Sequence, residues 1–112
     1  MARSNYTVDR SKSIDLQLEL QHHRVVLLVG IIAQSDGEVR VLVQIHPGSG
    51  ERIIPPQLQL SYLDENGSAL RTVVARTNDD YIQLPSFTCS IGTEFSIQLQ
   101  LNSCLTIERF VV

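Results

Sequence analysis

The side chains best suited to binding a ligand are concentrated in one short segment, from His46 to Arg52. His46 offers an imidazole, Ser49 a hydroxyl, Glu51 a carboxylate and Arg52 a guanidinium. The intervening Gly48-Ser49-Gly50 supplies backbone amides that could hold an anion. The segment lacks the Gly-Lys-Ser/Thr element of a phosphate-binding P-loop. We therefore favour a structural connection between two sheets, and keep as the alternative a small-ligand or anion site in the loop from Pro47 to Arg52.

Elsewhere in the chain, the sequence shows no recognisable catalytic motif. The histidines are His22, His23 and His46, and no serine or cysteine lies in a recognisable nucleophile motif. The adjacent His22 and His23 would point to opposite faces of a regular strand, so they are poorly placed to share a metal ion. The sequence predicts that the protein is not an enzyme, with no catalytic residues, no metal site and no cofactor.

The two cysteines, Cys89 and Cys104, flank a strand predicted over residues 94–101. A strand of that length separates its ends by more than ~20 Å, whereas a disulfide needs Cα atoms within about 7 Å. We therefore expect two free thiols.

Composition excludes several classes of partner. The net charge is -3, and Lys12 is the only lysine, so the basic surface typical of nucleic-acid binders is missing. The apolar run from Val25 to Ala33 is far shorter than the ~20 residues of a membrane-spanning helix. The first residues show no apolar segment typical of a signal peptide. We expect a cytoplasmic protein that binds neither nucleic acid nor membrane.

The pattern of hydrophobic residues predicts an all-β protein. The run from Arg24 to Ala33 lacks polar interruptions and is expected to be a central strand covered on both faces, with a bulge at Gly30, so that aspartate at Leu27 or Leu28 should abolish folding. Further strands are predicted over residues 14–20, 39–45, 58–63, 69–75, 81–87, 94–101 and 104–112. In the last of these, Leu105 and Ile107 alternate with Thr106 and Glu108.

These strands and the turns between them predict an immunoglobulin-like β-sandwich of about 7–8 antiparallel strands. Asn66-Gly67 is the strongest hairpin signal. The sandwich is expected to occupy residues 13–112 and to follow a flexible lead-in at residues 1–12.

Glutamines mark the polar faces of two of these strands, Gln57 and Gln59 on one and Gln98 and Gln100 on another. Such uncharged faces can meet a protein without desolvating charge. The absence of catalytic motifs and these faces together predict a non-catalytic interaction module with a protein partner, and a homo-oligomer is also possible.

The segments VLVQIHPGSGERIIPPQLQLSYLDENGSAL, NDDYIQL, GTEFSIQLQL and TIERFVV add a more specific signal. Together they resemble the C-terminal β-sandwich domain of a cyanobacterial family of uncharacterised function, over roughly residues 12–112. Asp80 stands where the family pattern has asparagine. The resemblance implies a fold and a lineage but no activity. It also implies that longer members carry a helical N-terminal region, which would be a second possible partner for the sandwich.

Overall fold

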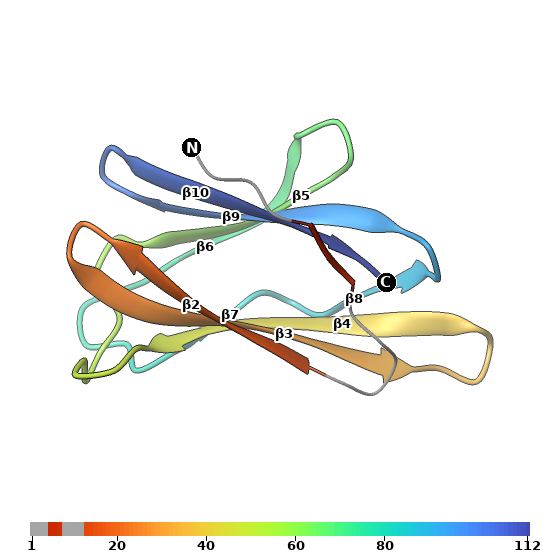
Figure 1. The fold of residues 1–112 in the computed structure, drawn as a ribbon, viewed down its shortest axis with the longest axis horizontal. Coiled ribbons are helices and arrows are strands. Elements are labelled where there is room, and N and C mark those ends of the chain that lie inside the picture. Colours follow the sequence, from red (N-terminus) through yellow and green to blue (C-terminus); the bar gives the residue numbers. More distant parts are fainter. Residues whose placement is uncertain (1–4, 8–12) are drawn as a thin grey trace.

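The computed structural model describes residues 5–7 and 13–112, and the strands of these residues form two stacked sheets (Figure 1). The predicted all-β sandwich is confirmed, and the described residues contain no helix. Consequently, no helix among them is long and apolar enough to cross a membrane.

One layer, called sheet A, contains five strands in the order β1-β10-β9-β5-β6. Neighbouring strands are antiparallel except for β1, which runs parallel to β10. The strands are β1 (Asn5–Thr7), β5 (Gln59–Leu63), β6 (Ala69–Val74), β9 (Glu94–Leu101) and β10 (Cys104–Val111). β1 falls inside the segment expected to be a flexible lead-in, and the rest of that segment lies outside the described residues.

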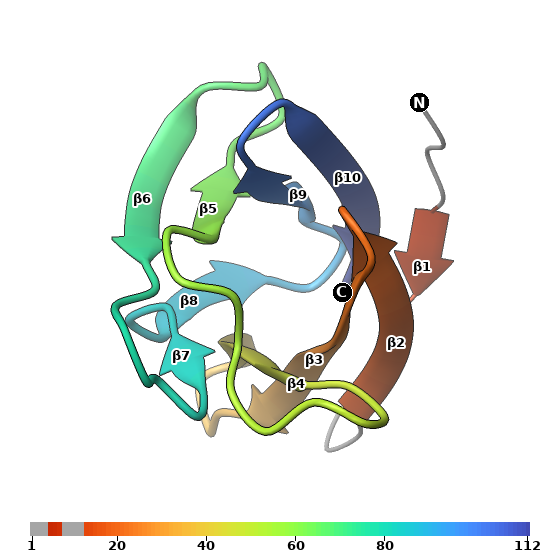
Figure 2. The same cartoon turned by 90° about the vertical axis from the view of Figure 1, so that its left-hand side faces the viewer.

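The other layer, called sheet B, has the order β2-β3-β4-β7, and β8 also pairs with β4. Its strands are β2 (Ser13–Leu20), β3 (His23–Ala33), β4 (Glu38–Pro47), β7 (Ile82–Gln83) and β8 (Phe87–Ser90). The strand predicted over 81–87 is therefore shorter than expected, and residues 87–90 form a separate strand that the hydrophobic pattern did not indicate. Seen end-on, the two sheets curve around a common interior (Figure 2).

The strand β3 lies inside sheet B as predicted, but it is not covered on both faces. Val25, Leu27, Val29 and Ile31 are buried in the core, whereas the alternate side chain of Leu28 is half-buried on the outer face. Gly30 pairs in regular register with Ser13 and Leu42, so the expected bulge is wrong.

The strand β10 turns the charged Glu108 inward. Phe110 pairs with Phe95, and both are buried, so every second residue back from Phe110 also faces the core. Glu108 is consequently only 5% exposed, while Leu105 is 38% exposed on the outer face. Because the strand must bury Phe110, its aliphatic residues are left on the surface of sheet A.

An aromatic cluster ties the two layers together. Phe87 of sheet B stacks on Tyr62 of sheet A with ring centroids 4.0 Å apart, and Phe95 packs edge-on against both rings. Cys89 in β8 and Cys104 in β10 are free thiols, as expected, and they lie in different sheets.

Candidate functional site

His46 does not project into the loop with which it was grouped. It lies in β4 on the outer face of sheet B, because the preceding Ile45 fills the core. Its ring stacks on Tyr81, with centroids 5.6 Å apart and planes 11° from parallel. Its Nε2 is 2.8 Å from Oε1 of Gln44, whose Nε2 donates to Gln83 at 2.7 Å. These contacts hold the imidazole within a row of polar side chains along sheet B.

The loop after Pro47 crosses from sheet B to sheet A, as the favoured interpretation predicted. Its start is held by the N–H of Gly48, which donates to the carbonyl of Arg24 at 2.8 Å. The N–H of Glu51 donates back to the carbonyl of Gly48 at 3.0 Å. Of the three amides that could have held an anion, that of Gly48 is thus bonded within the protein.

The remaining predicted residues of the loop point to separate surroundings. Oε1 of Glu51 lies 3.6 Å from Nδ1 of His23 at the start of β3. Ser49 and Arg52 are exposed, and Arg52 lines a shallow cavity of about 360 Å³ with Ile53 and Asn78. Within the described chain, no hydrogen bond or ion pair joins any two of the four predicted residues. His46 and Glu51 thus have their contacts with residues outside the predicted group.

The geometry offers little for nucleophilic or metal chemistry. Burial raises the pKa of the Cys89 thiol by more than a hydrogen bond from Thr93 lowers it, and nearby Glu38 adds a lesser increase, so the thiolate is disfavoured. Over the described residues, no three histidine, cysteine or acidic side chains come close enough together to hold a metal ion.

The outer face of sheet A is the larger candidate surface. Its centre is uncharged, because the strand registers set Gln59 beside Gln100 and Ser61 beside Gln98 and Thr72. The hydroxyls of Ser61 and Thr72 are 2.9 Å apart, which satisfies the buried Ser61. We call this surface the neutral face, and its residues are Gln59, Ser61, Thr72, Ser96, Gln98 and Gln100.

Aliphatic side chains border the neutral face on both sides. Because β10 buries Glu108 and Phe110, it places Leu105 beside Gln100 and Ile107 beside Gln98 on the outer face. On the other side Val74 of β6 pairs with Gln59 and is 44% exposed. An uncharged surface flanked by exposed aliphatic groups resembles the centre of a protein interface, where charge is scarce.

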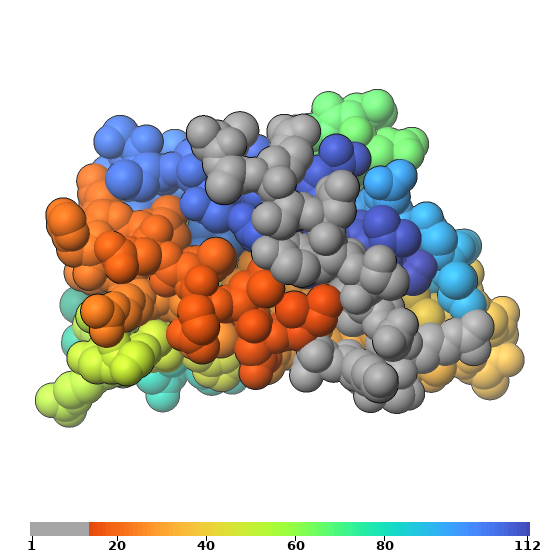
Figure 3. Space-filling model, in the orientation of Figure 1, coloured from red at the N-terminus to blue at the C-terminus, as the bar shows by residue number. Residues whose placement is uncertain are grey.

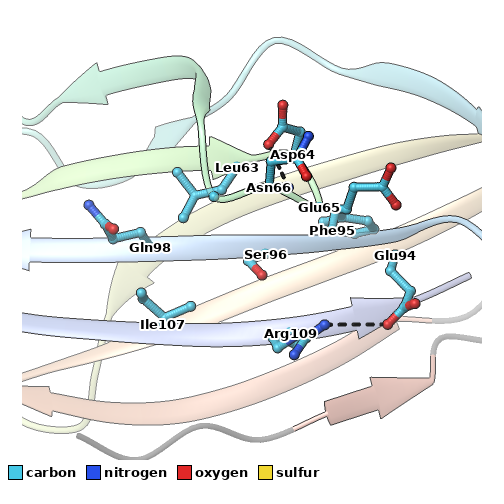
Figure 4. A pocket seen from close by; sticks show the side chains of 11 residues that line it. Leu63, Asp64, Glu65, Asn66, Glu94, Phe95, Ser96, Gln98, Ile107 and Arg109 are labelled. Carbon is cyan, nitrogen blue, oxygen red and sulfur yellow. Dashed lines mark hydrogen bonds and ion pairs between the residues drawn. The ribbon is translucent and has the colours of Figure 1, made fainter.

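A cavity of about 280 Å³ lies at one end of the neutral face, beneath the tip of the β5–β6 hairpin (Figure 4). Figure 3 shows this tip, in green, projecting above the blue strands of the same sheet. Oδ1 of Asp64 accepts the N–H groups of Asn66 and Ser68 at 2.9 Å each, which fixes the tip. Across the cavity, Arg109 and Glu94 form an ion pair at 3.5 Å. No histidine or cysteine is found among the described residues that line this cavity.

The sequence revealed only part of this surface. Gln59, Gln98 and Gln100 lie on it as their alternation suggested, but Gln57 does not, because it occupies a turn with φ of 74° before β5. Leu105 and Ile107 were missed, since alternation alone does not say which of two mixed faces turns inward. The buried Phe110 is the signal that fixes the answer.

Comparison with known proteins gives a family but no activity. The match is to a family described as a protein of unknown function (DUF1822), over residues 2–111. A search of curated proteins found no match, and a search of solved structures found none either. Because the match spans nearly the whole sequence, the chain belongs to this family of proteins of unknown function.

Proposed function

We propose that this chain is a non-catalytic interaction module that binds a protein partner through the neutral face of sheet A. The observation that carries the proposal is the composition of that face, which is uncharged at its centre and bordered by Val74, Leu105 and Ile107. Burying neutral amides and hydroxyls costs less than burying charge, provided that the partner supplies hydrogen bonds. The exposed aliphatic side chains would supply the apolar contact.

The hairpin tip adds shape to this otherwise flat surface. It overhangs one end of the neutral face and encloses the cavity next to Ser96 and Gln98. A side chain from the partner that entered this cavity would fix the register of binding, with the carboxylates of Glu65 and Glu94 near its rim favouring a basic or amide group. We also propose, as the sequence leads us to expect, that the sandwich is of immunoglobulin-like type and that the protein is cytoplasmic.

Affinity capture with matched single substitutions tests the proposal. Gln98→Lys places a charge at the centre of the neutral face, whereas Gln17→Lys places the same charge on the exposed outer face of sheet B. A partner captured from the native cell by the wild-type chain should be lost with Gln98→Lys and kept with Gln17→Lys. Equal retention by both variants, with circular dichroism showing both folded, would refute binding at this face.

A second candidate is an anion-binding site at the crossing loop, favoured by the exposed Arg52 and the cavity that it shares with Asn78. The hydroxyl of Ser49 and the amides of Ser49 and Gly50 would complete such a site. Phosphate should then raise the melting temperature of the wild-type chain but not that of Arg52→Ala or Ser49→Ala, and equal shifts in all three would exclude the site.

A further inference from the structure

The strand β6 is an edge strand of sheet A, and we call its side away from β5 the free margin. It pairs with β5 alone, and in Figure 2 no strand lies beyond it. All its side chains except the half-buried Val73 are exposed, including Leu70 and Val74, and its sequence ALRTVV contains no proline and one charge. Natural sheets usually protect such margins with prolines, several charges or a covering segment. In β6 the protection is limited to Arg71 and to a register shift near Leu70.

The backbone of β6 offers hydrogen-bonding groups at this margin. Just beyond the strand, both polar groups of Ala75 point toward β5, since its N–H donates to Leu58 at 2.8 Å and its carbonyl accepts from Gln57 at 2.9 Å. Along an antiparallel strand these groups alternate in direction. The N–H and carbonyl of Val74 and Thr72 therefore point away from β5, toward the free margin.

The side chains next to the margin are apolar or carry both signs of charge. A groove of about 430 Å³ runs between the end of β6 and β7, and Val73, Val74 and Ile82 form its apolar part. Arg76, Asp79 and Asp80 also line this groove, and the Arg76 guanidinium lies 3.4 Å from Oδ1 of Asp79. When two identical margins pair, the contact therefore contains charges of both signs.

We propose that a second copy of this chain pairs with β6 in antiparallel orientation, about a two-fold axis beside Val73. This register uses the regular stretch of β6, Arg71 to Val74, and avoids the register shift near Leu70. It sets Thr72 of each copy opposite Val74 of the other, so that their outward backbone groups form reciprocal hydrogen bonds. Val73 meets its own counterpart over the groove, and Arg71 lies opposite Ala75 instead of opposite another arginine.

Other symmetric registers are less favourable. An axis beside Arg71 would bring two guanidinium groups together, and an axis beside Thr72 would need Leu70, where the pairing with β5 is irregular. In the register that we propose, sheet A continues across the dimer and the neutral faces of the two copies lie on the same side. A two-fold contact of this kind is self-complementary and closes at a dimer.

Pairing along one short strand buries less than the roughly 1,200 Å² of a standard interface, so the dimer should be weak and its population should depend on concentration. Sedimentation equilibrium of the full chain, from low micromolar to near-millimolar concentration, should show the molar mass rising from monomer to dimer. A wild-type chain that stays monomeric over the whole range would overturn the proposal, and would leave heterologous binding at the neutral face standing.

Two double variants test the register. Thr72→Lys with Val74→Lys would set like charges opposite each other at two positions and should weaken dimerisation by about tenfold or more. Thr72→Lys with Val74→Glu would set opposite charges together and should preserve the dimer at low salt. Both variants must retain the circular dichroism of the wild type, because Thr72 also bonds to Ser61. Equal dimerisation by the two variants would exclude an axis at Val73.

Discussion

Leu27 and Leu28 are neighbours in β3 with opposite surroundings. Leu27 is 0% exposed and belongs to the core between the sheets. Leu28 is half-buried on the outer face of sheet B, where Asp15 and Gln44 are its cross-strand neighbours. A polar group at position 28 can therefore reach water, whereas one at position 27 cannot.

Aspartate should consequently be tolerated at only one of these two positions. Leu27→Asp buries a carboxylate without a partner and should cost at least about 4 kcal/mol, enough to unfold a domain of ordinary stability. Leu28→Asp should remain folded and lose about 1–2 kcal/mol, partly through repulsion from Asp15. Urea denaturation followed by circular dichroism measures both. Two unfolded variants would show that β3 is covered on both faces after all.

At the same scale, the inward side of β10 could not be predicted from its sequence. Leu105 and Ile107 form the more hydrophobic alternation, yet Glu108 is the residue that is buried. The deciding contact is Phe110 against Phe95, with ring centroids 5.5 Å apart, and this contact depends on the pairing of β10 with β9. A single strand does not contain that information, because one large aromatic residue can outweigh two aliphatic ones only once its neighbours are known.

At the scale of elements, local patterns predicted the strands well where one face is wet. Strand β9 has the bounds expected from its alternation, and the Asp64-to-Gly67 hairpin joins the two strands assigned to it. The turn at Gln21 and His22 has no local signal in the sequence, because both residues adopt positive φ without being glycine or asparagine. Tertiary pairing of β2 with β3 imposes that conformation on the turn.

The loop that crosses between the sheets is likewise shaped by close packing. At Gly48 a Cβ atom would lie 2.7 Å from the carbonyl carbon of Arg24, so the glycine permits the approach that anchors the loop. Gly50 differs, since it has a φ of 83° but open space around it. The glycines of this loop thus have structural roles that need no ligand.

Alanine substitution should separate these two roles. Gly48→Ala forces the loop and β3 apart and should cost about 2–3 kcal/mol of stability. Gly50→Ala meets only backbone strain and should cost about 1 kcal/mol. Thermal denaturation of the two variants gives the comparison, and a larger loss for Gly50→Ala would contradict the assignment of close packing at Gly48.

At the scale of the whole molecule, the two outer faces differ in ways that only the assembled sheets reveal. On the outer face of sheet B, His46 stacks on Tyr81 and hydrogen bonds join it to Gln44 and Gln83, so these polar groups are paired with one another. Sheet A presents an uncharged centre flanked by aliphatic side chains. The sequence grouped the candidate binding residues in the segment from His46 to Arg52 and marked the glutamine faces separately, and the fold brings Gln59, Gln98 and Gln100 together on sheet A.

Site-specific photo-crosslinking in the native cell tests this distinction most directly. A benzophenone side chain would replace Gln98 on the neutral face, Gln17 on the outer face of sheet B, or Ser49 in the crossing loop, all in the full chain. A partner bound at sheet A should be crosslinked from position 98 and not from position 17 or 49. Crosslinks from position 17 or 49 with none from position 98 would contradict the proposal that sheet A is the docking face.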